Sequence, residues 1–269
     1  MFNFVETVFY VYLFVALYMT SLLILIWYPN RKRLFDYPLG KAVPVSIVMP
    51  CYNESATIAR ALDSLLNLKY PQDMIEIIVV DDKSTDNSCE IVKEYVRKYP
   101  GKITLIVNKV NSGGAAEPTN MGVKMAKYDF VAVTDADSTP EPDALIKMIG
   151  FIQTDSRVAA VTCAVMARGV KTFMQKLQTI EYSIISWSRK LLDFIDAVYV
   201  TPGPFALYRK DILLKVGLFD TENMTQDIEI VWRLRSYGYK ARMCLAARVY
   251  SETPLRFKHW WKQRVRWNI

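Results

Sequence analysis

The chain has 269 residues, of which 52% are hydrophobic and 23% are charged, so a folded protein is expected instead of a disordered one. This length suits one sizeable α/β domain with an appendage. The net charge of +7 is compatible with nucleic acid, an anionic membrane or a phosphate-bearing substrate. The single histidine, His259, nearly excludes Ser-His-Asp catalysis and histidine-rich metal sites, so carboxylates should do any acid–base work. The four cysteines form no Cys-x-x-Cys pair and are expected to be reduced.

An uncharged apolar run lies near the start of the chain. Residues 7–28 carry no charge, and a helix of about 20 such residues crosses a bilayer. Arg31, Lys32 and Arg33 follow at once, which places the next segment on the cytoplasmic side of the membrane. A cleaved signal peptide fits less well because the basic residues come after the run, and its uniform apolarity disfavours a buried core helix. We therefore expect residues 1–42 to be a single transmembrane anchor with a juxtamembrane basic segment.

From residue 43 the sequence alternates short β-branched runs with helical stretches. Uninterrupted apolar runs are typical of a mostly parallel sheet that is covered by helices on both faces. The alternation predicts a Rossmann-like α/β domain over residues 43–254, in which ligands bind beyond the carboxyl ends of the strands. The expected strands are 45–50, 76–82, 103–107, 130–137 and 158–165, and the expected helices include 57–68 and 88–99, the second capped by Ser88.

Acidic pairs follow two of these strands. Asp135 and Asp137 are two residues apart at a strand end, so their side chains should leave on the same side. Two such carboxylates can hold Mg²⁺ or Mn²⁺ and leave positions for diphosphate oxygens. Asp81 or Asp82 can accept hydrogen bonds from a nucleobase or a ribose. The plainer interpretations are a solvated turn for the first pair and a helix-capping turn for the second.

Two further features are ambiguous on spacing alone. Gly113 and Gly114 let the backbone approach a phosphate closely, although a glycine pair is more often an ordinary loop. Asp227 lies at the expected start of a helix, where a carboxylate can remove a proton from an acceptor hydroxyl or simply stabilise the helix end. Spacing alone favours the second role for Asp227.

Two amphipathic helices are expected in the second half of the chain. An apolar stripe at alternating four- and three-residue steps runs from Phe173 to Phe194, and it suits either core packing or the membrane interface. In residues 255–269, the basic and aromatic stretch LRFKHWWKQRVRW predicts an interface helix with two faces. One face carries Gln263, Arg266 and Trp267, which suit a diphosphate and a sugar ring, and the other can rest on core or lipid. A plain interfacial helix and a nucleic-acid patch are the alternatives.

Taken in order, these segments resemble glycosyltransferase family 2, in particular its membrane-bound cellulose-synthase-like and hyaluronan-synthase-like branch. The matching segments are VSIVMPCYNES, IIVVDDKSTD, DAD, TPGPFALYRK, TQDIEIVWRLRSYGYK and QRVRW, and they span Val45 to Trp267. Each is weak alone, whereas their order and spacing are specific. The resemblance implies a GT-A fold, inverting transfer from a nucleotide-diphospho-sugar, and a divalent metal, Mn²⁺ or Mg²⁺.

The resemblance also implies roles for single residues. The catalytic base corresponds to Asp227, and the metal site to Asp135 and Asp137. The acceptor contacts correspond to Gly203, Gln263 and Trp267. The nucleotide pocket, with the glycine pair included, comprises Pro50, Tyr52, Glu54, Asp81, Asp82, Gly113, Gly114, Asp135 and Arg266.

The chain departs from the family pattern at two places. The family's Thr-Glu-Asp is here Thr225-Gln226-Asp227, so the base is kept while its neighbouring acid is neutral. Acceptor positioning or the pKa of the base can differ as a result. The family's frequent Gly-Lys is here Gly113-Gly114, so a phosphate-facing cation is missing there and Arg266 or Arg264 is expected to supply that charge.

The end of the sequence shapes the expected activity. Processive synthases of this branch continue into channel-forming helices, whereas this sequence ends two residues after Trp267. We therefore expect transfer of one or a few hexoses from a UDP- or GDP-sugar, GDP-mannose included, to a membrane-associated, lipid-linked glycan acceptor. The alternatives are the catalytic part of a processive polysaccharide synthase and a non-catalytic membrane scaffold with a degenerate transferase fold. Nucleic acid is not an expected partner, because it would not explain the ordered acidic residues at strand ends.

Overall fold

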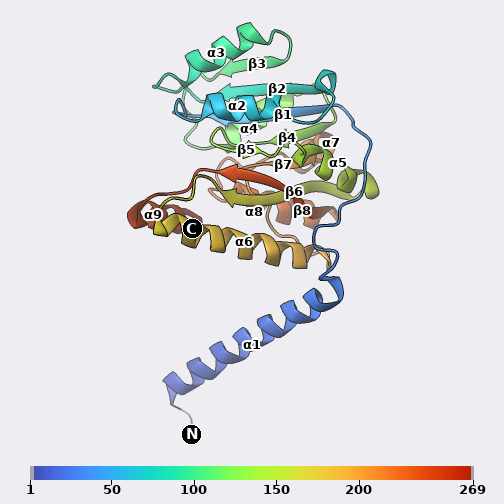
Figure 1. Ribbon diagram of the computed structural model, residues 1–269, viewed down its shortest axis with the longest axis vertical. Coiled ribbons are helices and arrows are strands. Elements are labelled where there is room, and N and C mark those ends of the chain that lie inside the picture. Colours follow the sequence, from blue (N-terminus) through green and yellow to red (C-terminus); the bar gives the residue numbers. More distant parts are fainter. Residues whose placement is uncertain (1–2, 268–269) are drawn as a thin grey trace.

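The computed structural model describes residues 3–267 of the chain, with side chains as far as Val265. In this part of the chain eight strands form one sheet in the order β3-β2-β1-β4-β7-β6-β8-β5 (Figure 1). The strands are β1 (Val45–Cys51), β2 (Ile75–Asp81), β3 (Ile103–Val107), β4 (Phe130–Val133), β5 (Thr139–Pro140), β6 (Val158–Ala167), β7 (Ala206–Arg209) and β8 (Lys240–Ser251). The helices are α1 (Phe4–Asn30), α2 (Ile58–Leu66), α3 (Ser88–Lys98), α4 (Ala116–Met125), α5 (Ala144–Thr154), α6 (Phe173–Asp193), α7 (Lys210–Val216), α8 (Gln226–Ser236) and α9 (Phe257–Trp267), with a short 3₁₀ turn η1 (Gln72–Met74).

The sheet is mixed, with a parallel half that positions the site. Strands β3, β2, β1 and β4 pair in parallel, β7 runs antiparallel between β4 and β6, and β6 pairs in parallel with β8. The short β5 pairs antiparallel with β8. Because β1, β2 and β4 run the same way, the residues after their carboxyl ends come to one edge of the sheet.

Both faces of the sheet are covered by helices, which explains the continuous apolar runs of the sequence. Successive residues of a strand point to opposite faces, so Ile47 packs with α2, α3 and α5, whereas Val48 packs with α4, α7 and α8. Every residue of β1 is buried. A strand that is buried on both sides needs apolar residues at every position instead of alternating ones.

Most of the expected elements are confirmed, with two corrections. The expected strand 130–137 ends at Val133, so Asp135 and Asp137 lie in a turn in which the Ser138 amide donates to the Asp135 carbonyl at 3.1 Å. Strand alternation therefore does not decide which way these two carboxylates point. Ser88 is also not the cap of α3, because its amide and hydroxyl both donate to the Asp86 carboxylate, at 3.0 and 2.5 Å.

Helix α6 has its polar side inward. Its N-terminus is closed by a capping box between Thr172 and Gln175. The upstream part of the expected apolar stripe faces outward, and Ile180 and Ile184 are each 58% exposed, whereas Leu191 near the other end is buried. The inward side carries polar and charged residues, which are Gln175, Gln178, Ser186, Arg189, Lys190 and Asp193.

A buried ion cluster fixes the downstream end of α6 to β8. The carboxylate of Asp193 accepts from Lys190 Nζ at 2.9 Å, from Arg242 Nε at 2.6 Å and from the Met243 amide at 3.0 Å. These donors balance the negative charge of the buried Asp193 carboxylate, which would otherwise be costly to remove from water. The outward apolar stripe of α6 is therefore held in place from the inside by polar contacts.

Helix α1 projects away from the body, on the side along which α6 lies (Figure 1). It is long and apolar enough to cross a membrane, and nearly all of its side chains are exposed. Ile26 near its end is the buried exception among its described residues. The four cysteines are free, as expected.

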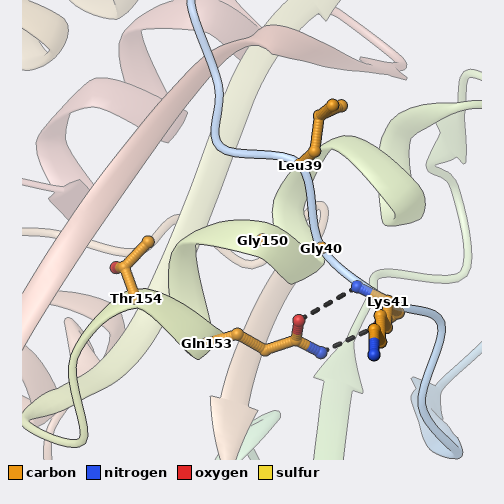
Figure 2. A pocket seen from close by; sticks show the side chains of 6 residues that line it. All are labelled: Leu39, Gly40, Lys41, Gly150, Gln153 and Thr154. Atoms are coloured by element: carbon orange, nitrogen blue, oxygen red, sulfur yellow. Dashed lines mark hydrogen bonds between the residues drawn. The ribbon is translucent and has the colours of Figure 1, made fainter.

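The segment between α1 and β1 is bound to the body through α5. Gln153 accepts from the Lys41 amide at 3.1 Å and donates to the Lys41 carbonyl at 2.8 Å, as Figure 2 shows. Gly40 and Gly150 approach each other closely, since a Cβ on Gly40 would lie 2.6 Å from Gly150 Cα, and a Cβ on Gly150 would lie 1.8 Å from the Pro38 carbonyl oxygen. The shallow pocket drawn in Figure 2 belongs to this junction, at the end of α5 that leads to the start of β6.

Candidate active site

A pocket at the carboxyl ends of β1 and β4 brings together several of the expected site residues. Pro50 from β1, Asp135 from the turn after β4, Gly203 from the loop before β7, and Asp227 from the first turn of α8 all line it. These four come from segments far apart in the sequence. The pocket therefore joins a residue expected for the nucleotide, one for the metal, one for the acceptor and the expected base.

The backbone of Asp227 connects the start of α8 to the loop before β7. The Asp227 carbonyl accepts from the amide of Thr201 at 3.1 Å. Burial raises the pKa of Asp227 above the usual range of a carboxyl, and the positive charge of Arg189 partly opposes that rise. Arg189 itself is 5% exposed, and its Nε has no hydrogen-bond partner in the described part of the chain. The result is a half-buried carboxylate that is more basic than a surface aspartate.

Gly203 packs directly against Asp135. A Cβ on Gly203 would lie 2.9 and 3.0 Å from the two carboxylate oxygens of Asp135, closer than real Cβ contacts allow. The loop is also held from the other side, because the hydroxyl of Thr134 donates to the Pro204 carbonyl at 2.7 Å. Glycine at 203 is thus needed for this approach, whatever it does for an acceptor.

Asp137 faces a different set of neighbours from Asp135. Its carboxylate accepts from the hydroxyls of Ser138 at 2.7 Å and Ser251 at 3.5 Å. Burial raises the pKa of Asp137, and the negative charge of Glu252 adds to the rise. A nearby cation would stabilise its ionised form.

Asp135 and Asp137 are the candidate carboxylate ligands for a hard divalent cation, and of these two Asp135 lines the pocket. In residues 3–267 no group of three or more acidic, histidine or cysteine side chains is arranged to hold a metal ion. Asp135 and Asp137 would supply two carboxylates, and the remaining positions would belong to water and substrate oxygens. Mg²⁺ and Mn²⁺ commonly bind in this way beside diphosphates.

The two aspartates at the end of β2 differ in their hydrogen bonding. Asp82 accepts from Asn108 Nδ2 at 2.6 Å and from the amide and hydroxyl of Ser112 at 2.9 and 2.8 Å. Asp81 accepts from the Ser84 amide at 3.1 Å, while its buried Oδ1 has no partner among the described residues. Asp82 therefore holds the loop of residues 108–112, and Asp81 keeps an oxygen that can accept a hydrogen bond from a ligand.

The loop after β1 is tied to the loop after β2. Asn53 has a left-handed backbone with a φ of 55°, and its Oδ1 accepts from the amides of Thr85 and Asp86 at 2.8 and 3.3 Å. The amide of Glu54 donates to the Ser88 hydroxyl at 2.7 Å. Burial raises the pKa of Glu54, with a contribution from the negative charge of Asp137, and Tyr52 beside it is exposed.

The glycine pair lies just before α4 in an open position. A Cβ on either Gly113 or Gly114 would meet nothing within 4 Å, and Gly113 has a φ of +81° that favours glycine. The loop around them is anchored through Ser112 to Asp82. Their proposed closeness to a phosphate stays a prediction.

Helix α9 forms over the expected residues. Phe257, Trp261 and Val265 share an exposed face, as the sequence predicts, and Gln263 is half-buried. The backbone of Arg266 and Trp267 belongs to α9, while their side chains lie outside the described residues, so the roles expected for them stay predictions.

Comparison with known proteins gives the family. The family model described as glycosyl transferase family 2 matches residues 46–217, which is more than half of the chain. The chain belongs to glycosyl transferase family 2. It is 35% identical over 240 residues to a poly-β-1,6-N-acetyl-D-glucosamine synthase of Staphylococcus epidermidis, covering 88% of this chain and 57% of the relative. A synthase of the same name from Staphylococcus aureus strain COL is 34% identical over 239 residues, covering 88% and 56%.

Solved structures support the GT-A fold of this family 2 glycosyltransferase. A mannosyltransferase from Pyrobaculum calidifontis, in complex with GDP-Man and Mn²⁺, aligns with a TM-score of 0.72 and 24% identity, over 94% of this chain and 70% of its own. TarS of S. aureus in complex with UDP aligns with a TM-score of 0.56 and 23% identity, over 78% and 61%. This chain spans little more than half the length of the curated synthases that it matches.

Several residues of the transferase pocket are not found by sequence reasoning. Thr119, Thr201, Tyr208 and Phe219 line it, and Tyr208 is fully buried with its hydroxyl donating to Thr201 Oγ1 at 2.8 Å. No local pattern marks them. Gln226 also lines the pocket, and its neutral side chain was visible as a departure from the family pattern. Arg189 could not be predicted either, because only the inverted packing of α6 turns it inward.

Proposed function

We propose that this family 2 glycosyltransferase is an inverting, divalent-metal-dependent enzyme that moves a hexose from a nucleotide-diphospho-sugar to an acceptor hydroxyl at a membrane. The observation that carries the proposal is the shared pocket of Asp135, Gly203 and Asp227 beyond the carboxyl ends of β1 and β4. Ligands of open α/β sheets bind at such an edge. A degenerate scaffold would not need to keep a base, a metal carboxylate and a close glycine contact in one pocket.

Asp227 acts as the general base in this proposal. It would accept the proton of the acceptor hydroxyl as that oxygen attacks the anomeric carbon and the nucleoside diphosphate leaves from the opposite side. Burial raises the pKa of Asp227, which makes it a stronger base than a surface aspartate, while backbone hydrogen bonds and the positive charge of Arg189 oppose that rise. An in-line displacement of this kind inverts the anomeric centre.

Asp135 and Asp137 would hold the Mn²⁺ or Mg²⁺ ion. When bound, such an ion neutralises charge on the departing diphosphate. Gly203 would leave room for the Asp135 carboxylate, since a Cβ at this position would lie 2.9 Å from one of its oxygens. Gly113, Gly114 and Arg266 are proposed to face the phosphates, and Gln263 and Trp267 the acceptor.

The donor is proposed to be a UDP-sugar, with N-acetylglucosamine as the first sugar to test. The partnerless Oδ1 of Asp81 offers one acceptor site, which suits the single imide N–H of uracil. A guanine edge presents two adjacent donors, and the second carboxylate oxygen of Asp81 already accepts from Ser84. The curated relatives are named as poly-N-acetylglucosamine synthases, which supports the same donor. GDP-mannose is the competing donor. Pro50, Tyr52 and Glu54 would complete the nucleoside pocket.

A membrane location follows from three helices in this proposal. Helix α1 would be the transmembrane anchor in residues 1–42, and the exposed stripe of α6 would rest on the bilayer surface, as would α9 in residues 255–269. An amphipathic helix whose polar side is buried and whose apolar side is exposed would be costly in water, and lipid removes that cost. The basic residues 31–33 after α1 would place residues 43–254, the catalytic domain, on the cytoplasmic face.

The acceptor is proposed to be a glycan hydroxyl held at the membrane. A lipid-linked glycan suits the membrane-facing α6, while the 34–35% identity with polymer synthases supports a growing polysaccharide chain as the second candidate. These two differ in product and not in chemistry. In the second case this chain is the catalytic part of a processive synthase.

A donor panel tests the proposal. The chain, purified in lipid nanodiscs with Mn²⁺ or Mg²⁺, is given UDP-N-acetylglucosamine, UDP-glucose and GDP-mannose, and nucleotide release and products are measured with and without EDTA. We expect metal-dependent release with a UDP-sugar and a β-linked product. Release from GDP-mannose alone would overturn the donor assignment, and absence of turnover with every donor would overturn the function. Product size separates single transfer from polymerisation.

A further inference from the structure

One charged contact joins the C-terminal helix α9 to α6. Arg264 of α9 donates from Nε to Glu181 Oε1 at 2.8 Å and from an Nη to Glu181 Oε2 at 2.5 Å. This is the forked, two-bond geometry that is specific to arginine and a carboxylate. The guanidinium side chain is 12% exposed and the carboxylate side chain 31% exposed, so the pair is partly shielded from water.

The rest of the described part of α9 has little apolar packing against the body. Trp261 is 57% exposed, and Phe257 and Val265 on the same face are exposed as well. The rings of Phe257, Trp260 and Trp261 mostly meet one another, with centroids 5.4 to 6.4 Å apart. The orientation of α9 around its own axis is therefore set to a large degree by polar contacts such as that of Arg264.

Arg264 also connects to residues of the site. One of its Nη atoms donates to Gln263 Oε1 at 3.1 Å, and its guanidinium lies 5.9 Å from the ring centre of Tyr182, the neighbour of Glu181. Helix α6 also contacts the segment between β8 and α9, since Gln178 Nε2 donates to the Pro254 carbonyl at 2.9 Å. Three residues earlier, the hydroxyl of Ser251 at the end of β8 donates to Asp137 at 3.5 Å. The segment that leads into α9 therefore runs from a contact of the expected metal-site residue Asp137.

We propose that Glu181 is a positioning residue for transfer, which fixes the rotation of α9 through Arg264 and so sets the direction of the neighbouring Gln263. This inference rests on the proposed function, because that function gives Gln263, Arg266 and Trp267 their roles. Glu181 touches no reacting atom. It acts by ordering Arg264, whose two bonds cannot both be kept if α9 turns.

The same pair is also the joint between the two helices that are proposed to meet the membrane. The pair connects α6 and α9 directly, so the placement of α9 depends on that of α6. Loss of the carboxylate would uncouple the helices and leave both folded, since α6 is fixed independently through Asp193.

The test uses Glu181→Gln in the full chain in nanodiscs, with Asp155→Asn as the matched control. Asp155 forms a two-bond pair with Arg157 next to the amino end of β6, away from the site. We expect faster hydrogen exchange of the α9 amides in Glu181→Gln. We also expect kcat to fall about tenfold, the effect of breaking one charge-assisted hydrogen bond, while KM for the sugar nucleotide changes less than about threefold. The control should leave the α9 exchange, kcat and KM unchanged.

The exchanged pair Glu181→Arg with Arg264→Glu should recover part of the lost kcat and slow the exchange again. Unchanged α9 exchange in Glu181→Gln would overturn the proposed ordering, and faster exchange with a normal kcat would overturn its importance for transfer. If the unaltered chain transfers no sugar at all, the proposed function fails, whereas the exchange measurement still decides whether Glu181 orders α9.

Discussion

The two regions proposed to meet the nucleoside and the acceptor are built in different ways. On the nucleoside side, Asn53 and Ser88 link the loops after β1 and β2, and Asp82 links the end of β2 to the loop after β3, each through hydrogen bonds with backbone amides. On the acceptor side, α6 shows an apolar stripe to the outside, and α9 is joined to it by the pair of Arg264 and Glu181. One side is organised by the sheet, and the other by a surface helix.

This contrast indicates which ligand meets binding groups that are already in place. A nucleotide of constant shape is recognised best by groups already in place, because little ordering free energy is then spent on binding. An acceptor that sits in or near lipid meets elements whose arrangement depends on the membrane. The contrast can be tested by substitutions on each side.

The largest effect is expected at the base, where the two sides meet. Asp227→Asn should lower the rate of transfer at least about 100-fold, the usual contribution of a general base, while leaving nucleotide binding unchanged. Initial rates of nucleotide release with acceptor present give the first quantity, and calorimetry with UDP and Mn²⁺ gives the second. Normal transfer by this variant would remove Asp227 from the mechanism.

The pH dependence adds a check on Asp227. Burial raises its pKa, so the rate should fall as pH drops through that raised value, where the carboxylate becomes protonated. The stability of the fold changes in the opposite direction. Folding favours the protonated Asp227 carboxyl, so stability is lost as pH rises from the ordinary pKa of a carboxyl through the raised pKa of the folded state. Asp227→Asn should therefore raise Tm near pH 8 without metal, and the gain should vanish below about pH 4, the ordinary range of a carboxyl.

The next effect concerns the contact between the two sides. Gly203→Ala puts a methyl group 2.9 Å from Asp135 Oδ1, so the carboxylate has to move. We expect metal-dependent UDP affinity to fall about tenfold, the cost of disturbing one charged ligand, as for Asp137→Ala. Titration with UDP at fixed Mn²⁺ and again in EDTA separates the metal-dependent part. Equal affinity of Gly203→Ala and the unaltered chain would show that Asp135 has room to adjust.

On the nucleoside side, smaller effects are expected, one on substrate binding and one on stability. Asp81→Asn should raise KM for the sugar nucleotide about tenfold with little change in stability, because it weakens the hydrogen bond to the base. Asp82→Asn should instead lower the free energy of unfolding by about 1–3 kcal/mol, because its carboxylate holds Asn108 and Ser112. Steady-state kinetics and urea unfolding of both variants make the comparison. If Asp82→Asn raised KM and Asp81→Asn lowered the free energy of unfolding, the roles given to the two aspartates would be reversed.

The smallest effect on turnover is expected on the outer side of α6. Ile184→Cys carrying a polarity-sensitive dye should report an apolar environment in nanodiscs, and the dye at Ser183→Cys, the next position around the helix, a more polar one. Cys89, which is half-buried, is replaced by serine in both. Stability should change by less than about 0.5 kcal/mol because these side chains are exposed. Equal emission from the two dyes would argue against membrane contact by α6.

The sequence is most informative where local pattern and tertiary role coincide. Continuous apolar runs predict the buried parallel strands, and the residues that follow β1 and β2 could be assigned to the site edge before any coordinates. The strand expected to reach Asp137 ends at Val133 instead, because a turn stabilised between Asp135 and Ser138 replaces it. Runs of apolar residues cannot show where a strand gives way to a turn.

Long-range packing accounts for what the sequence could not reveal. The apolar stripe of α6 is compatible with core or membrane, and the contacts of the buried Lys190 and Asp193 with each other and with Arg242 show that the polar side faces inward. The need for glycine at 203 comes from Asp135, 68 positions earlier, and has no local signature. The difference between Asp81 and Asp82 likewise depends on a loop some thirty residues away.

The glycine contact between the α1–β1 segment and α5 has a mechanical consequence. A free tether of the ten residues 34–43 would let its attached domain wander about 17 Å from its point of attachment and turn in any direction. Gln153 and the close approach of Gly40 to Gly150 hold this segment against α5, so it is a fixed connection and not a flexible tether. A side chain added at Gly150 would push this segment away from α5, and the domain would then be free to move relative to α1.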